Sequence, residues 1–383
     1  MTMARRVLCA AAAMAALATA PASGAEPIVV IAAFNLTGGS AVLDAPSYDG
    51  ALLAAEVINR DGGVLGRPLQ LVPVDTESRP DEVAAKVEAA LAAHPDAVAG
   101  IGYTYSTEAL NAGRVFQAKG LPFISPGATD PAVPAEVGDN LFYAAYGDDA
   151  QAAAMAAFAC NELKLDRAAV WIEDRDLYPR TIGRDFEESF ETLGGSVVLT
   201  QSDSGPAGFS TFIEKLKAVS PPAQAVYVAS MPDSGPDLIA SARSAGIDIP
   251  LLSGDGWDAD TIVAKSKEAS LDGIYFTTHA FLGVDTVGMK DFASAYTARF
   301  GSAPPNAFAP LGYDTVNLLA DAIRRAGSVD PASIRVALAA TTGFPGIVGA
   351  ISYEPGVRVP KKEVSVIAVD KGVQSLRWVA KPR

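Results

Sequence analysis

The stretch NRDGGVLGRPLQL, residues 59–71, contains the end of a helix, a glycine turn and the start of a strand. Asn59 closes an Ala-rich helical segment that begins near Tyr48, and the Asp-Gly-Gly sequence after it is a typical helix stop. Pro68 cannot continue a helix, and apolar residues suited to a strand follow it. We therefore predict a helix, a tight turn and a strand in immediate succession.

The same alternation of strand and helix signals continues along the chain. Strands are predicted at residues 28–34, 69–74, 97–101, 122–125, 168–172, 196–199, 225–228 and 250–252, and residues 274–278 are strand-like. Helices are predicted at 48–59, 81–93, 106–119, 148–163, 181–193, 209–219 and 236–245. This order is typical of parallel sheets with helices on both faces. A length of 383 residues suggests two domains, and the absence of a low-complexity linker favours lobes joined by a hinge of several crossing strands.

The N-terminus has the pattern of an export signal. Arg5 and Arg6 precede an Ala-rich apolar run over residues 7–20, and a small-residue site ends at Ala25. We predict a secretory signal peptide, residues 1–25, cut near Ala25. The run is too short to cross about 30 Å of hydrocarbon, and no later stretch reaches the roughly 20 apolar residues of a spanning helix. The expected mature protein is exported and soluble.

The charge balance excludes two classes of partner. The chain has 44 acidic and 30 basic residues, for a formal net charge of -14. Removal of the signal peptide would also remove Arg5 and Arg6, which makes the net charge of the mature chain more negative. Such a surface repels nucleic acid and anionic lipid. Cys160 is the only cysteine after the signal, so no intrachain disulfide is expected. Its Ala-rich helical context favours a buried small side chain over a reactive nucleophile.

Two loops in the first half of the chain combine hydroxyl groups with backbone amides. Ligands of an open parallel sheet gather beyond the carboxyl ends of the strands, where such loops lie. Hydroxyls and N–H groups at a helix start suit an anion, although ordinary helix capping and a plain turn are equally consistent with these sequences. The residues concerned are Tyr103, Thr104, Tyr105 and Ser106 in the first loop and Gly127, Ala128 and Thr129 in the second.

Two later loops offer an aromatic residue and an acid. Tyr178 follows the strand predicted at 168–172 and is a candidate for the wall of a cleft, although its charged neighbours are also typical of a solvated loop. Asp255 lies between two glycines beside Trp257, where a helix cap is the simpler alternative. Together, hydroxyls and amides from one lobe and an acid from the other would hold the carboxylate and ammonium of a zwitterion.

Over essentially its whole mature length the sequence resembles the type I periplasmic solute-binding proteins of the branched-chain amino acid class. The resemblance rests on residues 59–69, 103–107 and 126–129, on Tyr178 and on the Gly-Asp-Gly sequence at 254–256. It implies an α/β fold of two doubly wound parallel-sheet lobes joined by a multi-strand hinge that closes around the ligand. It also implies a first lobe of residues 26–144 with about 279–355, and a second lobe of 145–278 with about 356–383, which includes C-terminal strands around 363–369.

In that class, a first-lobe hydroxyl and a threonine with its neighbouring backbone bind the ligand carboxylate. The resemblance assigns this role to Thr104 or Ser106, to the backbone of residues 127–128 and to Thr129. It assigns Tyr178 to the second-lobe wall and Asp255 to the ligand ammonium. It further implies a periplasmic receptor that acts as a monomer and delivers its ligand to an ABC permease and its ATPase in the inner membrane.

Three departures from the class leave the ligand open. Tyr103 and Tyr105 stand where the class has small side chains, so they narrow the pocket or stack on a planar ligand. Asp255 is one methylene shorter than the glutamate common in the class, and residues 38–44 carry no aromatic side chain. An amino acid is the first expectation. Short amides, urea and aromatic carboxylates are the alternatives.

An enzyme is the least expected function. The sequence has no Gly-x-Ser-x-Gly or His-Glu-x-x-His motif, no phosphate loop, and no third glycine to complete a dinucleotide fingerprint at 100–102. Of its two histidines, His94 is expected at the exposed end of a helix and His279 at a hinge or cleft edge. We predict no catalytic residue, no cofactor and no metal. The ligand-reading component of a sensor remains a second class of function.

Overall fold

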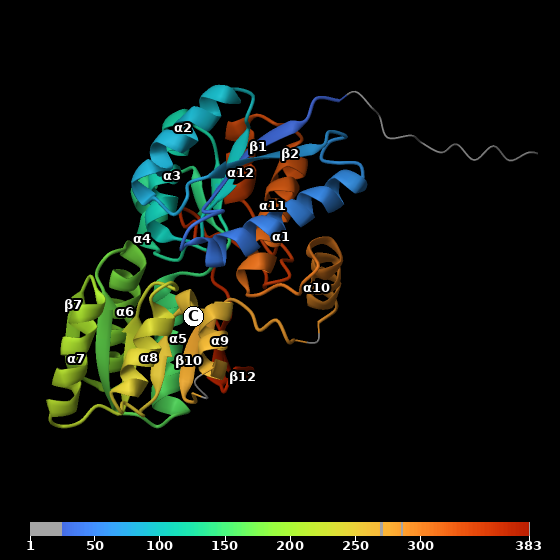
Figure 1. The fold of residues 1–383 in the computed structure, drawn as a ribbon. Helices are drawn as coiled ribbons and strands as arrows, with labels where there is room; N and C mark the ends of the chain where they lie inside the picture. The colour runs from blue at the N-terminus through green and yellow to red at the C-terminus, as the bar shows by residue number, and fades with distance from the viewer. Residues whose placement is uncertain (1–24, 269–270, 285, 383) are drawn as a thin grey trace, which may run out of the picture.

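In the computed structural model the chain forms two α/β lobes, one above the other in Figure 1. The structure describes residues 25–268, 271–284 and 286–382, so the predicted signal peptide lies outside them apart from Ala25. The first lobe contains β1 (Ile28–Phe34), α1 (Ala41–Arg60), β2 (Leu69–Asp75), η1 (Pro80–Glu82), α2 (Val83–Ala93), β3 (Ala99–Gly102), α3 (Ser106–Lys119), β4 (Phe123–Ser125), α4 (Ala132–Val137), β5 (Leu141–Tyr143), α10 (Val287–Phe300), α11 (Phe308–Ala326) and α12 (Pro331–Ala339). The second contains α5 (Asp148–Asn161), β6 (Arg167–Glu173), α6 (Leu177–Thr192), β7 (Ser196–Asp203), α7 (Pro206–Ala218), β8 (Ala225–Ala229), α8 (Gly235–Ser244), β9 (Leu251–Ser253), η2 (Asp255–Trp257), α9 (Asp260–Glu268), β10 (Ile274–Thr278), β11 (Val364–Asp370) and β12 (Val373–Ala380). Among the described helices, none combines the length and the hydropathy needed to span a membrane.

The stretch at residues 59–71 folds as its sequence predicts. Helix α1 ends at Arg60, and Gly63 takes a left-handed φ of 80° in the turn. A Cβ at Gly63 would lie 2.1 Å from the Arg67 carbonyl oxygen, so only glycine fits. Asn59 closes the turn, because its Nδ2 donates to the Leu69 carbonyl at 2.8 Å and its Oδ1 accepts the Leu69 N–H at 2.7 Å. The helix is thereby tied to the start of β2.

The first sheet has five parallel strands in the order β2-β1-β3-β4-β5. Every residue of β1 is buried, and its sequence is an uninterrupted apolar run. This is what a parallel strand requires when helices cover both faces of its sheet. The carboxyl ends of β1, β3 and β4 therefore share one edge, which faces the second lobe in Figure 1.

The second sheet has seven strands in the order β12-β11-β10-β9-β8-β6-β7. Strands β6 to β10 are parallel, whereas β11 runs antiparallel to β10 and β12 antiparallel to β11. The β11–β12 hairpin turns at Lys371 and Gly372, which both have positive φ, as a two-residue hairpin loop requires. The predicted α/β fold with two parallel-sheet lobes is confirmed, and the antiparallel hairpin is an addition to it.

Helices α10, α11 and α12 return to the first lobe after β10, and α11 packs along α1. The backbones of the two helices are in close contact. A Cβ at Gly50 would lie 1.8 Å from the Ala309 carbonyl oxygen, and a Cβ at Gly312 would lie 1.8 Å from the Ser47 carbonyl oxygen. The chain thus passes between lobes after β5, after β10 and before β11. The expected lobe limits near 144, 279 and 355 stay predictions.

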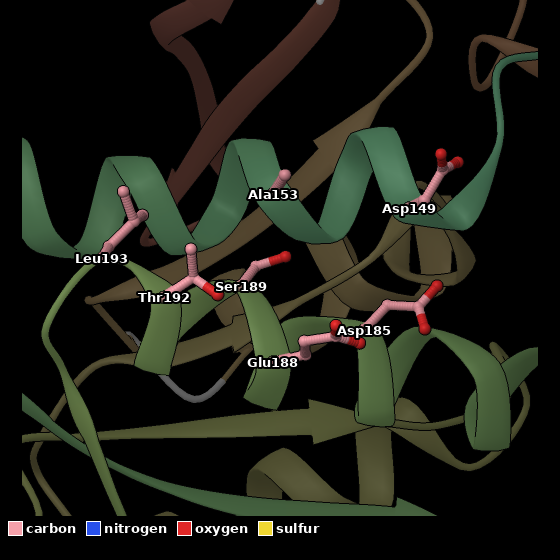
Figure 2. Close-up of a pocket in the computed structure, with 7 residues that line it drawn as sticks. All are labelled: Asp149, Ala153, Asp185, Glu188, Ser189, Thr192 and Leu193. Atoms are coloured by element: carbon pink, nitrogen blue, oxygen red, sulfur yellow. The ribbon is translucent and has the colours of Figure 1, made fainter.

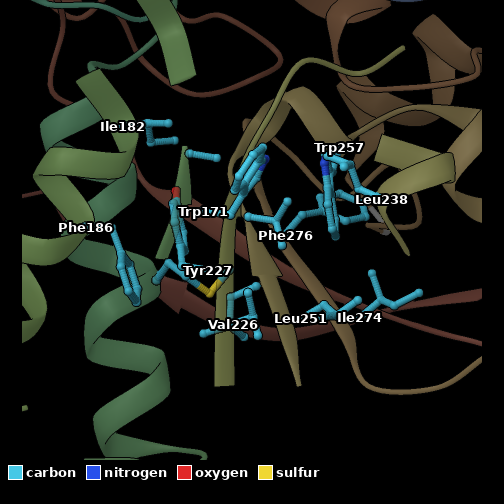
Figure 3. Close-up of a cluster of buried hydrophobic side chains, with 14 of the residues drawn as sticks. Trp171, Ile182, Phe186, Val226, Tyr227, Leu238, Leu251, Trp257, Ile274 and Phe276 are labelled. Carbon is cyan, nitrogen blue, oxygen red and sulfur yellow. The ribbon is translucent and has the colours of Figure 1, made fainter. Parts of the chain in front are cut away.

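Aromatic rings on both faces of the second sheet hold its helices in place (Figure 3). Trp171 on β6 is 1% exposed and packs against Phe209 and Phe212 of α7, with ring centroids 5.2 and 5.8 Å away. Tyr227 on β8 stacks on Phe186 of α6 at 4.0 Å. Such pairs add to the stabilisation from buried area. They fix the strand ends on which the site depends.

One helix begins earlier than the sequence predicts. The helix expected at 48–59 starts at Ala41, so Asp44 lies in a helix instead of a loop. Pro46 lies inside α1 and has no N–H for the carbonyl of Val42. That carbonyl instead accepts the Asn306 side-chain amide at 3.1 Å, which explains how the helix tolerates the proline. Strands β5 and β12 were not predicted.

Candidate functional site

A small cavity of about 10 Å³, with room for roughly one water molecule, lies between the two lobes. Its first-lobe wall comes from the loops after β3 and β4 and from the starts of α1 and α11, and its second-lobe wall from the starts of α6 and η2 and the loop after β8. Open parallel sheets place their ligands at such strand ends. The lining residues are Leu43, Thr104, Tyr105, Thr129, Tyr178, Pro232, Asp255, Gly256 and Phe308.

Five of the nine predicted site residues line this cavity, and the other four lie behind its walls. Those in the lining are Thr104, Tyr105, Thr129, Tyr178 and Asp255. Those behind it are Tyr103, Ser106, Gly127 and Ala128, all buried. The lining residues Leu43, Pro232, Gly256 and Phe308 were not predicted as ligand contacts.

The turn after β3 divides its side chains between the cavity and the lobe interior. Tyr103 has a φ of 58°, which is uncommon for a residue with a side chain, and its ring is fully buried in the first-lobe core. Thr104 and Tyr105 face the cavity. Ser106 begins α3, and its Oγ accepts the Asp130 N–H at 3.2 Å, which joins this turn to the one after β4.

The turn after β4 presents only Thr129 to the cavity. Gly127 packs against Phe308, whose ring would lie 2.7 Å from an added Cβ. The Ala128 N–H donates to Ser125 Oγ at 3.0 Å, so this amide is already engaged. The backbone donors expected to hold a carboxylate are therefore fewer than the sequence suggested.

A buried acid that the sequence did not indicate holds Thr104. Asp44 Oδ1 accepts both the Thr104 N–H at 2.7 Å and the Thr104 hydroxyl at 2.8 Å, while Oδ2 accepts the Asn35 N–H at 2.7 Å. Asp44 is fully buried, and this burial raises its pKa to about 7 against the opposing effect of the hydrogen bonds. Thr104 consequently presents oxygen lone pairs to the cavity while its proton points at Asp44.

Tyr178 is positioned by the first turn of α6. Asp176 caps this helix, accepting the Tyr178 N–H at 3.2 Å. The phenolic oxygen accepts the Gly256 N–H at 2.9 Å, which links α6 to η2. Burial holds the pKa of the Tyr178 phenol well above its usual range. The phenol therefore keeps its proton and can donate it to a ligand.

Asp255 is held by two side chains of the second lobe and its hinge. Its Oδ1 accepts Gln151 Nε2 at 2.9 Å, and its Oδ2 lies 2.9 Å from His279 Nε2. The Gln151 Oε1 in turn accepts the Asp255 N–H at 3.1 Å. The carboxyl group is almost fully buried yet lines the cavity. Its remaining lone pairs are suited to an ammonium group.

His279 lies directly after β10, where the chain leaves the second lobe. Its ring stacks on Tyr146 at 4.1 Å and meets Phe308 edge-on at 5.5 Å. Burial lowers the pKa of the imidazole, and Asp255 opposes this shift. A neutral ring binds the Asp255 carboxylate through a proton on Nε2. His279 is thus at the cleft edge, where the sequence suggested it.

The cavity has an acidic and aromatic character. Its nine lining residues include one acid, the three rings of Tyr105, Tyr178 and Phe308, and no lysine or arginine. A second buried acid, Asp148, accepts Gln151 Nε2 at 2.8 Å, and burial raises its pKa well above the usual range. Rings and acids of this kind attract an ammonium or another hydrogen-bond donor.

A separate hollow of about 300 Å³ lies on the surface of the second lobe, between α5 and α6. Figure 2 shows Asp149 on α5 across from Asp185 and Glu188 on α6. It shares no lining residue with the interlobe cavity. Across the residues that the structure describes, no group of three or more His, Cys, Asp or Glu side chains is arranged to hold a metal ion.

Residues 27–373 match the protein family described as "Periplasmic binding protein". The amino acid binding protein of Pseudomonas aeruginosa is 28% identical over 310 residues, which cover 80% of each chain. The crystal structure of the leucine binding protein LivK from Thermotoga maritima has a TM-score of 0.83 and 28% identity, over 93% of this chain and 99% of that one. The branched-chain amino acid transporter substrate binding protein LivJ from Streptococcus pneumoniae, in complex with isoleucine, has a TM-score of 0.84 and 26% identity, over 93% of this chain and 100% of that one.

Proposed function

This chain belongs to the periplasmic binding protein family, and from that membership we propose that it is an extracytoplasmic receptor for an amino acid. The observation that carries the proposal is a cavity lined by both lobes, with Asp255 on one wall and Thr104 and Thr129 on the other. An α-amino acid has an ammonium and a carboxylate on one carbon. The two walls suit these two groups once the lobes separate, because the cavity of about 10 Å³ has room for roughly one water molecule.

We propose that the ammonium binds Asp255 and that the carboxylate faces the first lobe near Thr104 and Thr129. Tyr178 donates from the second lobe, and the side chain of the ligand lies among Leu43, Tyr105 and Phe308. A charge-assisted hydrogen bond inside a cavity closed from water contributes about 1.5–3 kcal/mol. The same bond on an exposed surface contributes little.

Hinge closure is the proposed means of both capture and signalling. Hydrogen bonds already join the lobes beside the cavity, and two of them come from residues of α6. The Thr181 hydroxyl donates to Asp130 Oδ2 at 2.8 Å, and the Leu177 N–H donates to Thr107 Oγ1 at 3.4 Å. A ligand that touches both walls would favour this contact between the lobes. The closed form is then the form that a transporter recognises.

A ligand with a planar group is the second candidate, because three aromatic rings line the cavity. Such rings stack on flat amide, urea or aromatic groups as well as on a cation. Short amides, urea and aromatic carboxylates therefore belong in any ligand screen. They bind by stacking and do not need the ammonium contact at Asp255.

The remaining features of the proposal follow from the family. We propose export to the periplasm with removal of a signal peptide near Ala25. We propose delivery of the ligand to an ABC permease and its ATPase, with the receptor acting as a monomer and performing no catalysis. Co-purification with the permease would test the partner, and turnover of the bound ligand would contradict the receptor function.

Thermal unfolding of the mature protein tests the ligand class. Amino acids, their amides, urea and aromatic acids are added one at a time. A ligand at 100 times its dissociation constant stabilises the folded state by about 2.7 kcal/mol, which raises Tm by several degrees. A rise with an amino acid but not with its amide supports the zwitterion site. A rise in Tm only with amides, urea or aromatic acids supports a ligand with a planar group instead.

Thr129→Val should weaken binding of an amino acid by about 1 kcal/mol, because it removes the Thr129 hydroxyl, which also interacts with Asp148, from the first-lobe wall and keeps the side-chain volume. Calorimetric titration measures the loss. Thr297→Val is a matched control, since Thr297 is an exposed residue of α10 outside the cavity lining. Equal affinity of wild type and Thr129→Val would mean that the first lobe holds the ligand without this hydroxyl.

A further inference from the structure

Asp44 lies directly behind the cavity wall and engages a residue of the lining. The Thr104 N–H and the Thr104 hydroxyl both donate to its Oδ1, at 2.7 and 2.8 Å. These are two of the donors that a ligand carboxylate would otherwise use on the first lobe. With Asp44 ionised, Thr104 can accept a hydrogen bond from a ligand but cannot donate one.

The charge of Asp44 opposes a ligand carboxylate as well. No salt bridge pairs Asp44 with a cation in the described part of the chain, and the cavity lining contains no lysine or arginine. A ligand carboxylate at Thr104 would lie one hydroxyl group away from the Asp44 carboxylate. Two carboxylates that share a buried site do not both stay ionised at low cost. One of them must take up a proton.

We propose that Asp44 sets the choice of ligand group on the first lobe, and that a ligand carboxylate binds there together with one proton taken up by Asp44. The inference rests on the proposed function as an amino acid receptor. The proton comes from solvent and bonds to the Asp44 carboxylate. The new O–H donates to Thr104 Oγ1, and the Thr104 hydroxyl proton turns to the ligand carboxylate. An amide group can donate its own N–H to Thr104 Oγ1 and needs no proton.

The surroundings of Asp44 support proton uptake near neutral pH. Burial raises its pKa to about 7. The nearest titratable groups are Glu108 on α3, whose pKa burial raises to about 8, and the phenols of Tyr103 and Tyr105, which stay protonated. Asn35 donates to both acids, at 2.7 Å through its N–H and at 3.4 Å through Nδ2. The charged and polar contacts of α10 with α1 lie further along the helix, at Asp49 and Glu56.

The direction of the pH effect follows from linkage. Carboxylate binding favours protonated Asp44, so affinity is full below about pH 7 and falls as the pH rises through the pKa of Asp44. His279 would act in the opposite direction. Its protonation at low pH would neutralise Asp255 and weaken the hold on an ammonium. The sign of the pH dependence therefore distinguishes a buried acid from His279, and the variants of Asp44 and Glu108 distinguish the two acids.

Calorimetric titration with L-leucine between about pH 6 and about pH 8.5 tests the proposal, because free leucine keeps both charges over this range. The dissociation constant should increase by about tenfold or more across the range. Titration at about pH 8 in two buffers of different ionisation enthalpy should show uptake of between about 0.5 and 1 proton per leucine bound. The second measurement uses only the wild-type protein.

Two variants distinguish the effect of Asp44 from the effects of nearby residues. Asp44→Asn keeps the size of the side chain and removes the charge, so the affinity for L-leucine should become independent of pH, with no proton uptake. Glu108→Gln is the matched control in the same buried cluster, and it should retain both effects. If Asp44→Asn does not fold, the number of protons that the wild-type protein takes up per leucine bound tests the proposal.

Each outcome bears on the inference. Leucine binding without a pH dependence and without proton uptake overturns it and leaves the proposed function intact. A pH dependence that persists in Asp44→Asn assigns the proton elsewhere and also overturns it. Absence of leucine binding at every pH rejects the receptor function for this amino acid class, and the inference about its carboxylate with it.

Discussion

Asp255→Asn should weaken binding of an amino acid by about 1.5–3 kcal/mol, a loss of roughly 10- to 150-fold in affinity. The substitution keeps the shape of the side chain, and the remaining amide oxygen would still accept Gln151 Nε2. The neutral His279 ring can change its tautomer to accept the new amide. What disappears is the negative charge that faces the ligand ammonium in a cavity closed from water. Calorimetric titration with the amino acid that gives the largest thermal shift measures this loss.

The control for this variant is Asp260→Asn. Asp260 is an exposed acid at the start of α9, outside the cavity lining, so its replacement should leave affinity unchanged. Ligands without an ammonium, such as aromatic carboxylates, should be insensitive to Asp255→Asn or bind better. Unchanged affinity of Asp255→Asn for the amino acid, with an intact fold, would remove Asp255 from the binding site.

Gly312→Ala should destabilise the protein by about 2 kcal/mol. An added Cβ would lie 1.8 Å from the Ser47 carbonyl oxygen, so α11 and α1 must move apart. Forced separation in a well-packed core typically costs about 1–3 kcal/mol, and here the obstacle is backbone, which cannot rotate away. The better helix propensity of alanine returns at most about 1 kcal/mol. The clash therefore outweighs the propensity gain, and Tm should fall by several degrees.

Gly205→Ala is a suitable control for the helix crossing. No atom lies within 4 Å of an added Cβ at this position, and Gly205 has no left-handed φ. Its effect on Tm should be small. The reciprocal variant Gly50→Ala should reproduce the loss seen with Gly312→Ala, because it opens the same contact from the other helix. Unaltered stability of both helix variants would show that α1 and α11 can separate at little cost.

Much of the fold could be predicted from local signals. The run of apolar residues at 28–34 coincides with β1, and the glycine turn after Asn59 appears where the sequence places it. These signals are local, because a buried parallel strand requires apolar residues and a left-handed turn requires glycine at the same positions in the sequence. The C-terminal hairpin was missed because its second strand, β12, is mostly half-exposed and carries no comparable apolar run.

The site was harder to predict, because its supporting residues come from distant segments. Thr129 and Asp255 could be found, since they follow apolar strands in loops of unusual composition. Phe308 and Gln151 carry no such local signal, as they reach the site from helices α11 and α5. The sequence predicts a loop at Asp44, and only the packed structure brings this acid to Thr104. The roles of these residues depend on contacts between segments that are distant in the sequence, and such contacts cannot be read from the sequence alone.

The packing of α11 on α1 has a consequence for how the chain is made. Helix α1 emerges early from the ribosome, whereas α11 lies near the end of the polypeptide. Until synthesis reaches α11, α1 can pack against β1 and β2 but lacks its main helical partner, and the first lobe cannot complete its core. Contacts between such distant segments form slowly and leave apolar surface open to aggregation. The core of the first lobe is therefore completed only late in synthesis, after α11 has been made.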